Sequence, residues 1–133
     1  MKYLCLIYQE EATLDAMSED EYDAMVEEVL AYREELRQSG HYISSDPLYP
    51  VQTATTIRVR NGKLSITDGP FAETKEQLGG YYLIDASDLN DAIRVAAKMP
   101  SAGAGCIEVR PIKEFIPRDR AGVASRRTTR PPD

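Results

Sequence analysis

The sequence contains few of the residues from which metal centres and redox sites are built. Its 133 residues include two cysteines, one histidine and no tryptophan. Cys5 and Cys106 lie near opposite ends of the chain, so they form neither a zinc-binding motif nor a redox motif. The sequence also has no glycine-rich phosphate loop and no nucleophile elbow. Nothing in it predicts a cofactor or a metal.

Long hydrophobic runs are absent as well. No run approaches the roughly 20 apolar residues that are needed to span a bilayer. Residues 1–8 hold too short an apolar block for a signal peptide, and no small-residue cleavage site accompanies it. These absences predict a cytoplasmic protein that does not bind a membrane.

Negative charge dominates the chain but is distributed unevenly. The net charge is −6, while residues 117–133 carry five arginines and two aspartates, a balance of +3 that leaves −9 for the other residues. Binding to nucleic acid requires a basic surface that neutralises phosphates. The acidic body therefore argues against nucleic acid as the main partner.

The clearest helical pattern begins after Ser18. Glu21 follows Ser18 at the spacing of a capping box, and Gly40 is a typical C-terminal stop. Between these signals, side chains recur at steps of three and four residues, which predicts an amphipathic helix as far as about Ser39. The stripe consists of Tyr22, Met25, Val26, Val29, Tyr32, Arg33 and Leu36.

Two alternating segments, residues 53–60 and 63–67, flank Asn61-Gly62, which is a strong signal for a two-residue hairpin. Because side chains alternate between the faces of a strand, Asp68 shares the face of the apolar hairpin residues. We expect this face, and with it the Asp68 carboxylate, to point towards the core. The turn sets a register that pairs Val59 with Leu64, Ile57 with Ile66 and Thr55 with Asp68.

The remaining patterns complete a two-layer α+β fold of the ferredoxin-like kind, ordered β-α-β, inserted hairpin, β-α-β. Its two helices would cover one face of the sheet, and a second copy would cover the other face. Tyr3, Tyr8, Tyr81 and Tyr82 are candidates for that interface. The further elements are strands over 2–8, 80–86 and 106–112, a polar connection over 9–14, an edge strand or irregular segment over 41–50, and a helix capped by Ser87 or Asp88 that Pro100 ends.

One long motif carries a family resemblance. Asp68-Gly69-Pro70-Phe71, followed by residues 73–82 (ETKEQLGGYY), resembles the DGPF branch of the YCII-related (YciI-like) proteins, as do residues 2–8 and 107–112. The resemblance implies a dimeric α+β barrel, a homodimer and no established activity. Its members are mostly bacterial and are often encoded beside, or fused to, extracytoplasmic-function sigma factors. We therefore divide the chain into a domain over 1–116 and a basic tail over 117–133.

The resemblance does not bring a catalytic pair with it. Other YciI-like proteins are thought to use a His-Asp pair in a cleft, in one case for a dehydrochlorination, and their histidine lies in the first helix. That helix contains no histidine here, and the single histidine, His41, follows Gly40. His41 after a helix C-terminus suits a capping role better than catalysis. Whether the chain is an enzyme therefore stays open.

Asp68 is the candidate catalytic residue, as a general base or as an acceptor for a ligand donor in a cleft. Its alternative role is that of a turn residue whose carboxylate accepts N–H bonds from residues 69–71. Glu73, Lys75 and Glu76 alternatively form local charge pairs on a solvated turn. Since Tyr81 and Tyr82 point to opposite faces, at most one should line a given cleft. The candidate ligand-binding residues are Phe71, Glu73, Lys75, Glu76, Tyr81 and Tyr82.

Two functional hypotheses follow. In the first, a cleft near the Asp-Gly-Pro-Phe loop binds a small molecule and supports proton transfer. In the second, the chain is a regulatory or interaction protein associated with an extracytoplasmic-function sigma factor. The acidic body and the basic tail offer contrasting surfaces for such a protein partner.

Overall fold

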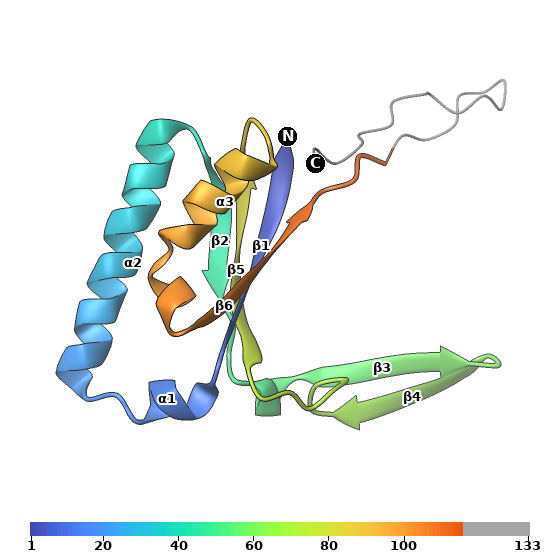
Figure 1. Cartoon of the computed structure of the whole chain (residues 1–133). Helices are drawn as coiled ribbons and strands as arrows, with labels where there is room; N and C mark the ends of the chain where they lie inside the picture. Colours follow the sequence, from blue (N-terminus) through green and yellow to red (C-terminus); the bar gives the residue numbers. More distant parts are fainter. Residues whose placement is uncertain (116–133) are drawn as a thin grey trace, which may run out of the picture.

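In the computed structural model, which describes residues 1–115, helices stand against one face of an antiparallel sheet and a separate hairpin extends from the base (Figure 1). The predicted tail, 117–133, lies outside the described residues. The elements are β1 (Lys2–Gln9), α1 (Glu11–Asp15), α2 (Glu19–Ser39), β2 (Tyr42–Pro47), the 3-10 turn η1 (Val51–Thr53), β3 (Thr55–Arg60), β4 (Lys63–Asp68), β5 (Gln77–Asp85), α3 (Leu89–Ala97), the 3-10 turn η2 (Pro100–Gly103) and β6 (Gly105–Pro111).

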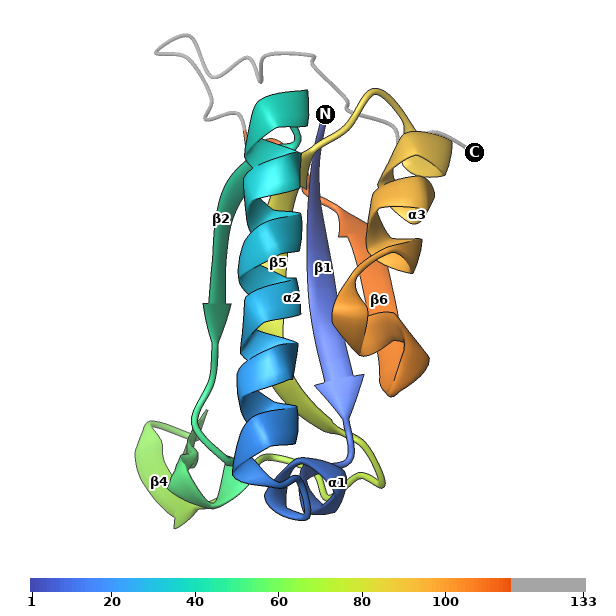
Figure 2. The ribbon, with the colours of Figure 1, turned by 90° about the vertical axis from the view of Figure 1, so that its left-hand side faces the viewer.

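The main sheet has the strand order β2-β5-β1-β6, and every neighbouring pair is antiparallel. Apart from the inserted hairpin, this is the strand order of a ferredoxin-like fold, so the predicted fold class is confirmed. Helices α2 and α3 lie side by side over the same face of the sheet (Figure 2). Strand β2, which ends at Pro47, takes the edge position where proline is tolerated.

Local signals define the ends of α2 as expected. The Ser18 hydroxyl accepts a hydrogen bond from the Glu21 N–H at 3.1 Å, and the Glu21 carboxylate accepts one from the Ser18 N–H at 3.1 Å. At the other end, Gly40 adopts the left-handed conformation, with φ of 82°. The prediction of a polar connection over residues 9–14 was incomplete, because the short helix α1 begins at Glu11.

Helix α2 is fastened to the domain through its C-terminal half. Tyr32 and Leu36 are buried, and the Tyr32 hydroxyl donates to the Val95 carbonyl of α3 at 2.6 Å. Burial raises the pKa of Tyr32 to about 12, so this hydroxyl keeps its proton. Tyr22, near the N-terminal end of α2, is 51% exposed, and Leu30, in the middle of the helix, is 47% exposed. Towards its N-terminal end α2 leans away from the sheet (Figure 1).

The core lies between the sheet and the helices. It contains two of the four tyrosines that were predicted to lie at the dimer interface. Tyr3 and Tyr82 are buried in this core rather than placed on the open face of the sheet. Tyr8 and Tyr81 are half-buried, and their strand positions alternate with those of the buried residues. Cys5 is fully buried as well, and burial raises the pKa of its thiol to about 11, which makes it a structural residue.

The hairpin has the predicted register but not the predicted environment. Asn61 and Gly62 both have positive φ, and Thr55 pairs with Asp68 as expected. However, β3 and β4 form their own two-stranded sheet, which projects from the body as an arm (Figure 1). Its apolar face is exposed: the relative exposures are 62% for Ile57, 58% for Val59, 63% for Leu64 and 61% for Ile66.

The expectation that Asp68 points towards the core is therefore wrong for this chain. Asp68 shares the face of the apolar hairpin residues, but that face is solvent-exposed, and so is Asp68. Alternation along a strand specifies which residues share a face, whereas the element that covers the face is set by distant parts of the chain.

The family motif contains one glycine with a strict steric requirement. A Cβ atom at Gly80 would lie 2.9 Å from the Asp46 carbonyl oxygen of β2, whereas at Gly79 the nearest atom, in the flexible Gln9 side chain, would be 3.7 Å away. We expect Gly80→Ala to lower the free energy of unfolding by about 1–3 kcal/mol through strain between β2 and β5. Gly79→Ala should have a much smaller effect. Urea unfolding of the two variants measures the difference, and equal effects would contradict this account.

Candidate functional site

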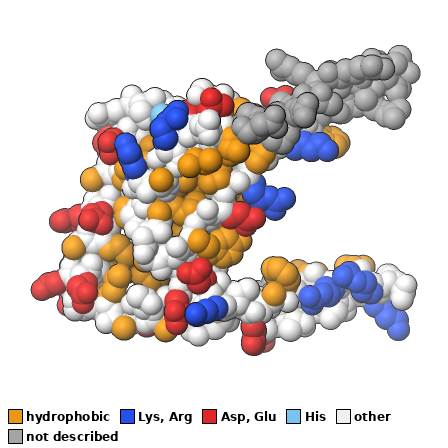
Figure 3. All heavy atoms as spheres, in the orientation of Figure 1, with side chains coloured by type: hydrophobic (Ala, Val, Ile, Leu, Met, Phe, Trp, Pro, Cys, Tyr) orange, Lys and Arg blue, Asp and Glu red, His pale blue; other side chains and the backbone are white. Residues whose placement is uncertain are grey.

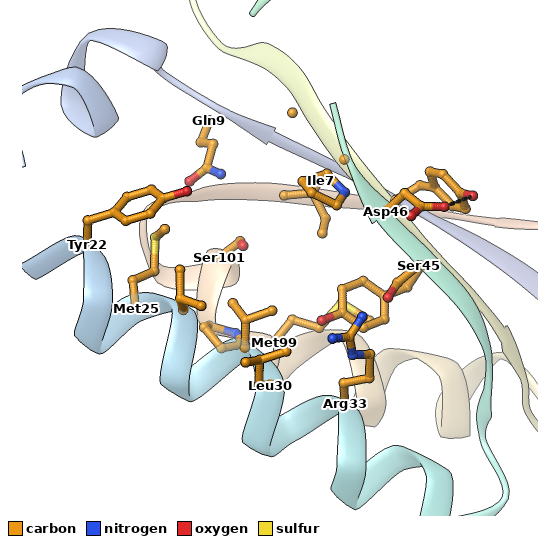
Figure 4. Close-up of a pocket in the computed structure, with 18 residues that line it drawn as sticks. Ile7, Gln9, Tyr22, Met25, Leu30, Arg33, Ser45, Asp46, Met99 and Ser101 are labelled. Carbon is orange, nitrogen blue, oxygen red and sulfur yellow. Dashed lines mark hydrogen bonds between the residues drawn. The ribbon is translucent and has the colours of Figure 1, made fainter. Parts of the chain in front are cut away.

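The lean of α2 leaves a cavity of about 350 Å³ between its N-terminal half and the sheet (Figure 4). The cavity is bounded by α2, by the ends of β1, β2 and β5, and by the chain around η2. Its lining consists of Ile7, Gln9, Tyr22, Met25, Val26, Val29, Leu30, Arg33, Ser45, Asp46, Pro47, Gly79, Gly80, Tyr81, Tyr82, Met99, Pro100 and Ser101.

Most of the wall is apolar. Helix α2 contributes aliphatic side chains at three- and four-residue steps, and β1 and the segment after α3 contribute Ile7 and Met99. On β5, Gly79 and Gly80 offer no side chains to fill the space. The glycine pair of the family motif therefore serves two purposes: Gly80 lets β2 approach β5, and both residues leave the floor of the cavity bare.

Polar groups lie at the two ends of the cavity. Figure 4 places Gln9 and Tyr22 at one end and Arg33 and Ser45 at the other, with the apolar side chains between them. Such a long apolar space with a few polar groups is the usual form of a small-molecule site.

Arg33 brings a positive charge to its end of the cavity. Burial alone would raise the pKa of Tyr42, but hydrogen bonds with Ser45 and Arg33 and the positive charges of Arg33 and Arg37 outweigh burial, so this pKa lies below its usual value. The Tyr42 and Ser45 hydroxyls are 2.9 Å apart. For Tyr82, burial prevails over the opposing charge of Arg33 and raises the pKa.

The structure does not gather the predicted site residues in one place. Tyr81 and Tyr82 both border the cavity, which corrects the expectation that at most one of them lines a given cleft. Phe71 is 80% exposed, and Glu73 is exposed too. Lys75 and Glu76 border a different, open hollow together with Tyr8, Glu10, Cys106 and Glu108.

The structure places Asp68 apart from the α2 cavity. Within residues 1–115 its carboxylate is exposed, accepts no hydrogen bond from residues 69–71, and borders neither this cavity nor the open hollow beside Lys75 and Glu76. The loop is instead held by its backbone, since the Gly69 N–H donates to the Ala54 carbonyl at 2.7 Å and the Thr56 hydroxyl donates to the Gly69 carbonyl at 2.8 Å.

Sequence reasoning missed the α2 cavity, although two signals pointed to it. The first is Arg33, a charged residue within an otherwise apolar helical stripe. The second is the glycine pair at the start of a strand, which marks a place where a side chain would obstruct a neighbour or a ligand.

A second group of side chains resembles a Ser-His-Asp triad but has the wrong chemistry for one. Ser39 Oγ lies 2.7 Å from His41 Nδ1, and His41 Nε2 lies 3.0 Å from Asp91 Oδ2. The single proton of the Ser39 hydroxyl has two neighbouring acceptors, because the Leu36 carbonyl lies 3.1 Å away and competes with His41 Nδ1 for it. A nucleophilic serine must pass this proton to its base, and the competing carbonyl disfavours that transfer.

The location of this group also disfavours nucleophilic catalysis. It lies at the C-terminal end of α2, where the negative end of the helix dipole opposes a developing oxyanion. The His41 N–H also closes the helix by donating to the Leu36 carbonyl at 3.0 Å. His41 thus caps α2 and links it to Asp91 of α3, in keeping with the predicted capping role.

Residues 1–115 hold no group of three or more histidine, cysteine, aspartate or glutamate side chains placed to bind a metal ion. In the same range, no helix is both long and apolar enough to cross a membrane.

Comparisons with known proteins agree with the motif. The family model described as the YCII-related domain matches residues 1–116. An uncharacterised protein of Rhizobium meliloti (strain 1021) is 35% identical over 119 residues, which cover 88% of this chain and 96% of the relative. The name of that relative states no activity.

The contact between His41, which caps α2, and Asp91 of α3 predicts that the stability of the protein depends on pH in a specific way. The hydrogen bond from the Ser87 N–H, together with His41, holds the pKa of Asp91 below its ordinary value of 3.8. In the unfolded chain Asp91 protonates first, so its contribution to stability is complete above pH 3.8 and is lost as the pH falls through the folded pKa.

We therefore expect Asp91→Asn to destabilise the protein at neutral pH and to differ less from wild type as the pH falls below 3.8. Urea unfolding at a series of pH values measures this difference. Asp23→Asn, which neutralises an exposed aspartate on α2, controls for net charge. A gap between wild type and Asp91→Asn that does not change with pH would contradict the assignment.

Proposed function

The chain belongs to the YCII-related family, and we propose that it binds a small molecule with a largely apolar body in the cavity under α2. The volume of about 350 Å³ carries the proposal, because cavities that hold small ligands measure about 300–1,000 Å³ and have mainly apolar walls. The polar groups at the two ends would orient such a ligand.

The cavity is unlike an ordinary packing defect. Protein interiors are packed as densely as organic crystals, and an unfilled apolar space loses dispersion contacts on every wall. Tyr22 and Leu30 lie along this space and are about half exposed, so a ligand would cover apolar surface that the chain itself leaves in water. Occupation by a ligand would restore the missing contacts.

Binding suits the lining better than proton transfer does. The one carboxylate among the lining residues belongs to Asp46, which accepts a hydrogen bond from the Tyr81 hydroxyl at 2.9 Å, and no imidazole borders the cavity. Burial raises the pKa of Tyr82, so this phenol keeps its proton near neutral pH and is poorly suited to act as a general base. The hypothesis of proton transfer by Asp68 gains no support from the exposed position of that residue.

We also propose a homodimer in which the hairpin arm contacts the second copy. The apolar face of the arm, defined by Ile57, Val59, Leu64 and Ile66, is a contiguous exposed patch of the kind that marks interaction sites. The opposite strand faces carry Arg58 and Arg60, which complement the acidic body. An open notch separates the arm from the body (Figure 3).

The regulatory alternative draws on the same arm. An exposed apolar surface would equally suit another protein, such as an extracytoplasmic-function sigma factor. We favour the second copy because the helices cover only one face of the main sheet (Figure 1). Two copies would therefore have two uncovered surfaces each, the arm and the open sheet face, with which to contact each other.

Filling the cavity should abolish ligand binding without unfolding the protein. We expect the neutral dye Nile red to bind wild type with increased fluorescence, and Val29→Trp to weaken binding at least about tenfold because the indole occupies the space. Glu28→Trp introduces the same group at an adjacent exposed position and should bind like wild type. Equal binding by both variants would place the dye elsewhere.

The homodimer is tested by placing charge on the apolar face of the arm. We expect wild type to sediment as a dimer and the double variant Ile57→Asp with Ile66→Asp to sediment as a monomer, because burying two unpaired carboxylates is costly. Ser65→Asp, on the opposite face of β4, should remain a dimer. A monomeric wild type that retains RNA polymerase or a sigma factor in a pull-down would favour the regulatory alternative instead.

A further inference from the structure

Arg33 is the one cation among the residues that line the cavity under α2. It occupies the same helical face as Val26, Val29 and Leu30, so a guanidinium continues a row of aliphatic side chains. Arg33 is half-buried, and it reaches from α2 towards Ser45 of β2 (Figure 4). A charge in this position is costly to desolvate unless something pairs with it.

No carboxylate pairs with Arg33 anywhere in the part of the chain that the structure describes. Its neighbours on the helices do have acidic partners: Arg37 pairs with Glu34, and Arg94 pairs with Asp91. Asp46 borders the same cavity but makes no ion pair with Arg33, and its carboxylate is engaged by the Tyr81 hydroxyl.

Uncharged hydrogen-bonding groups lie beside Arg33, and a second cation, Arg37, lies over the ring of Tyr42. Tyr42 and Ser45 place two hydroxyls beside it, 2.9 Å from each other. The pKa of Tyr42 lies below its usual value because the hydrogen bonds with Ser45 and Arg33 and the charges of Arg33 and Arg37 together outweigh burial. This end of the cavity therefore offers several donors and a positive charge, and its one carboxylate, that of the exposed Asp46, forms no ion pair with Arg33.

We infer that the ligand of this cavity is an organic monoanion, a carboxylate on an apolar body, whose charged end pairs with Arg33. This inference rests on the proposed function and specifies its ligand class. A guanidinium matches a carboxylate through two parallel N–H···O bonds, which favours this head group over a hydroxyl or an amine. The apolar body would extend along α2 towards Met25 and Tyr22, at the far end of the cavity (Figure 4).

The test compares three ligands that share one chain and differ only in the head group. Isothermal titration calorimetry of the full chain with octanoate, 1-octanol and octylamine should rank octanoate first and the cationic amine last. Hydrogen bonds to charged groups are strong enough to give octanoate an advantage over octanol on the order of tenfold to a hundredfold. Arg33→Gln should reduce this ratio to about one, and Arg33→Lys should keep part of it.

Arg37→Gln is the matched control. Arg37 lies one turn further along α2 and outside the cavity, with its guanidinium 5.0 Å from the centre of the Tyr42 ring. This variant removes the same charge and should retain the preference for octanoate. Thermal unfolding of each variant verifies that it is folded, and the comparison of head groups on wild type requires no variant at all.

The possible outcomes separate the two proposals. Equal affinity of wild type for octanoate and octanol would overturn the anion inference and leave the binding function intact. A preference for octanoate that survives in Arg33→Gln, or that disappears in Arg37→Gln, would overturn the role of Arg33. If none of the three ligands binds wild type, both the anion inference and the proposed function are wrong.

Discussion

The attachment of α2 at one end governs the rest of the structure. Its C-terminal half is held by the buried Tyr32 and Leu36, by the hydrogen bond from the Tyr32 hydroxyl to Val95, and by the contact between His41 and Asp91. Its N-terminal half has no comparable anchor and leans away from the sheet. A helix fastened at both ends would close on the sheet, and the cavity exists because this one does not.

The family motif contributes to the cavity through backbone rather than through a charged side chain. Gly80 is needed where β5 passes the carbonyl of Asp46, and together with Gly79 it leaves the floor without side chains. The opening residues of the same motif lie on the exposed arm, away from the cavity. The glycine pair of the motif thus lines the proposed ligand cavity, while the first residues of the motif lie at the end of the hairpin arm. This arrangement fits the proposal that the protein binds a small molecule and contacts a second chain.

Sequence reasoning succeeded where the governing interactions are local. The capping box at Ser18, the stop at Gly40 and the hairpin register each depend on a few neighbouring residues, and all three occur as predicted. It failed for Asp68, because whether an apolar strand face is covered depends on distant parts of the chain. The cavity was not predicted for the same reason, since it also depends on how distant elements pack. The one local sign of it was Arg33, a charged residue within an apolar stripe.

The four methionines provide the most direct test of the central claim, that the space under α2 is a binding site. Met25 and Met99 line the cavity, whereas Met1 and Met17 lie outside it. In a protein labelled with carbon-13 at its methionine methyl groups, titration with octanoate should shift the signals of Met25 and Met99 and leave those of Met1 and Met17 in place. Shifts confined to Met1 and Met17, or no shifts at saturating ligand, would contradict the account.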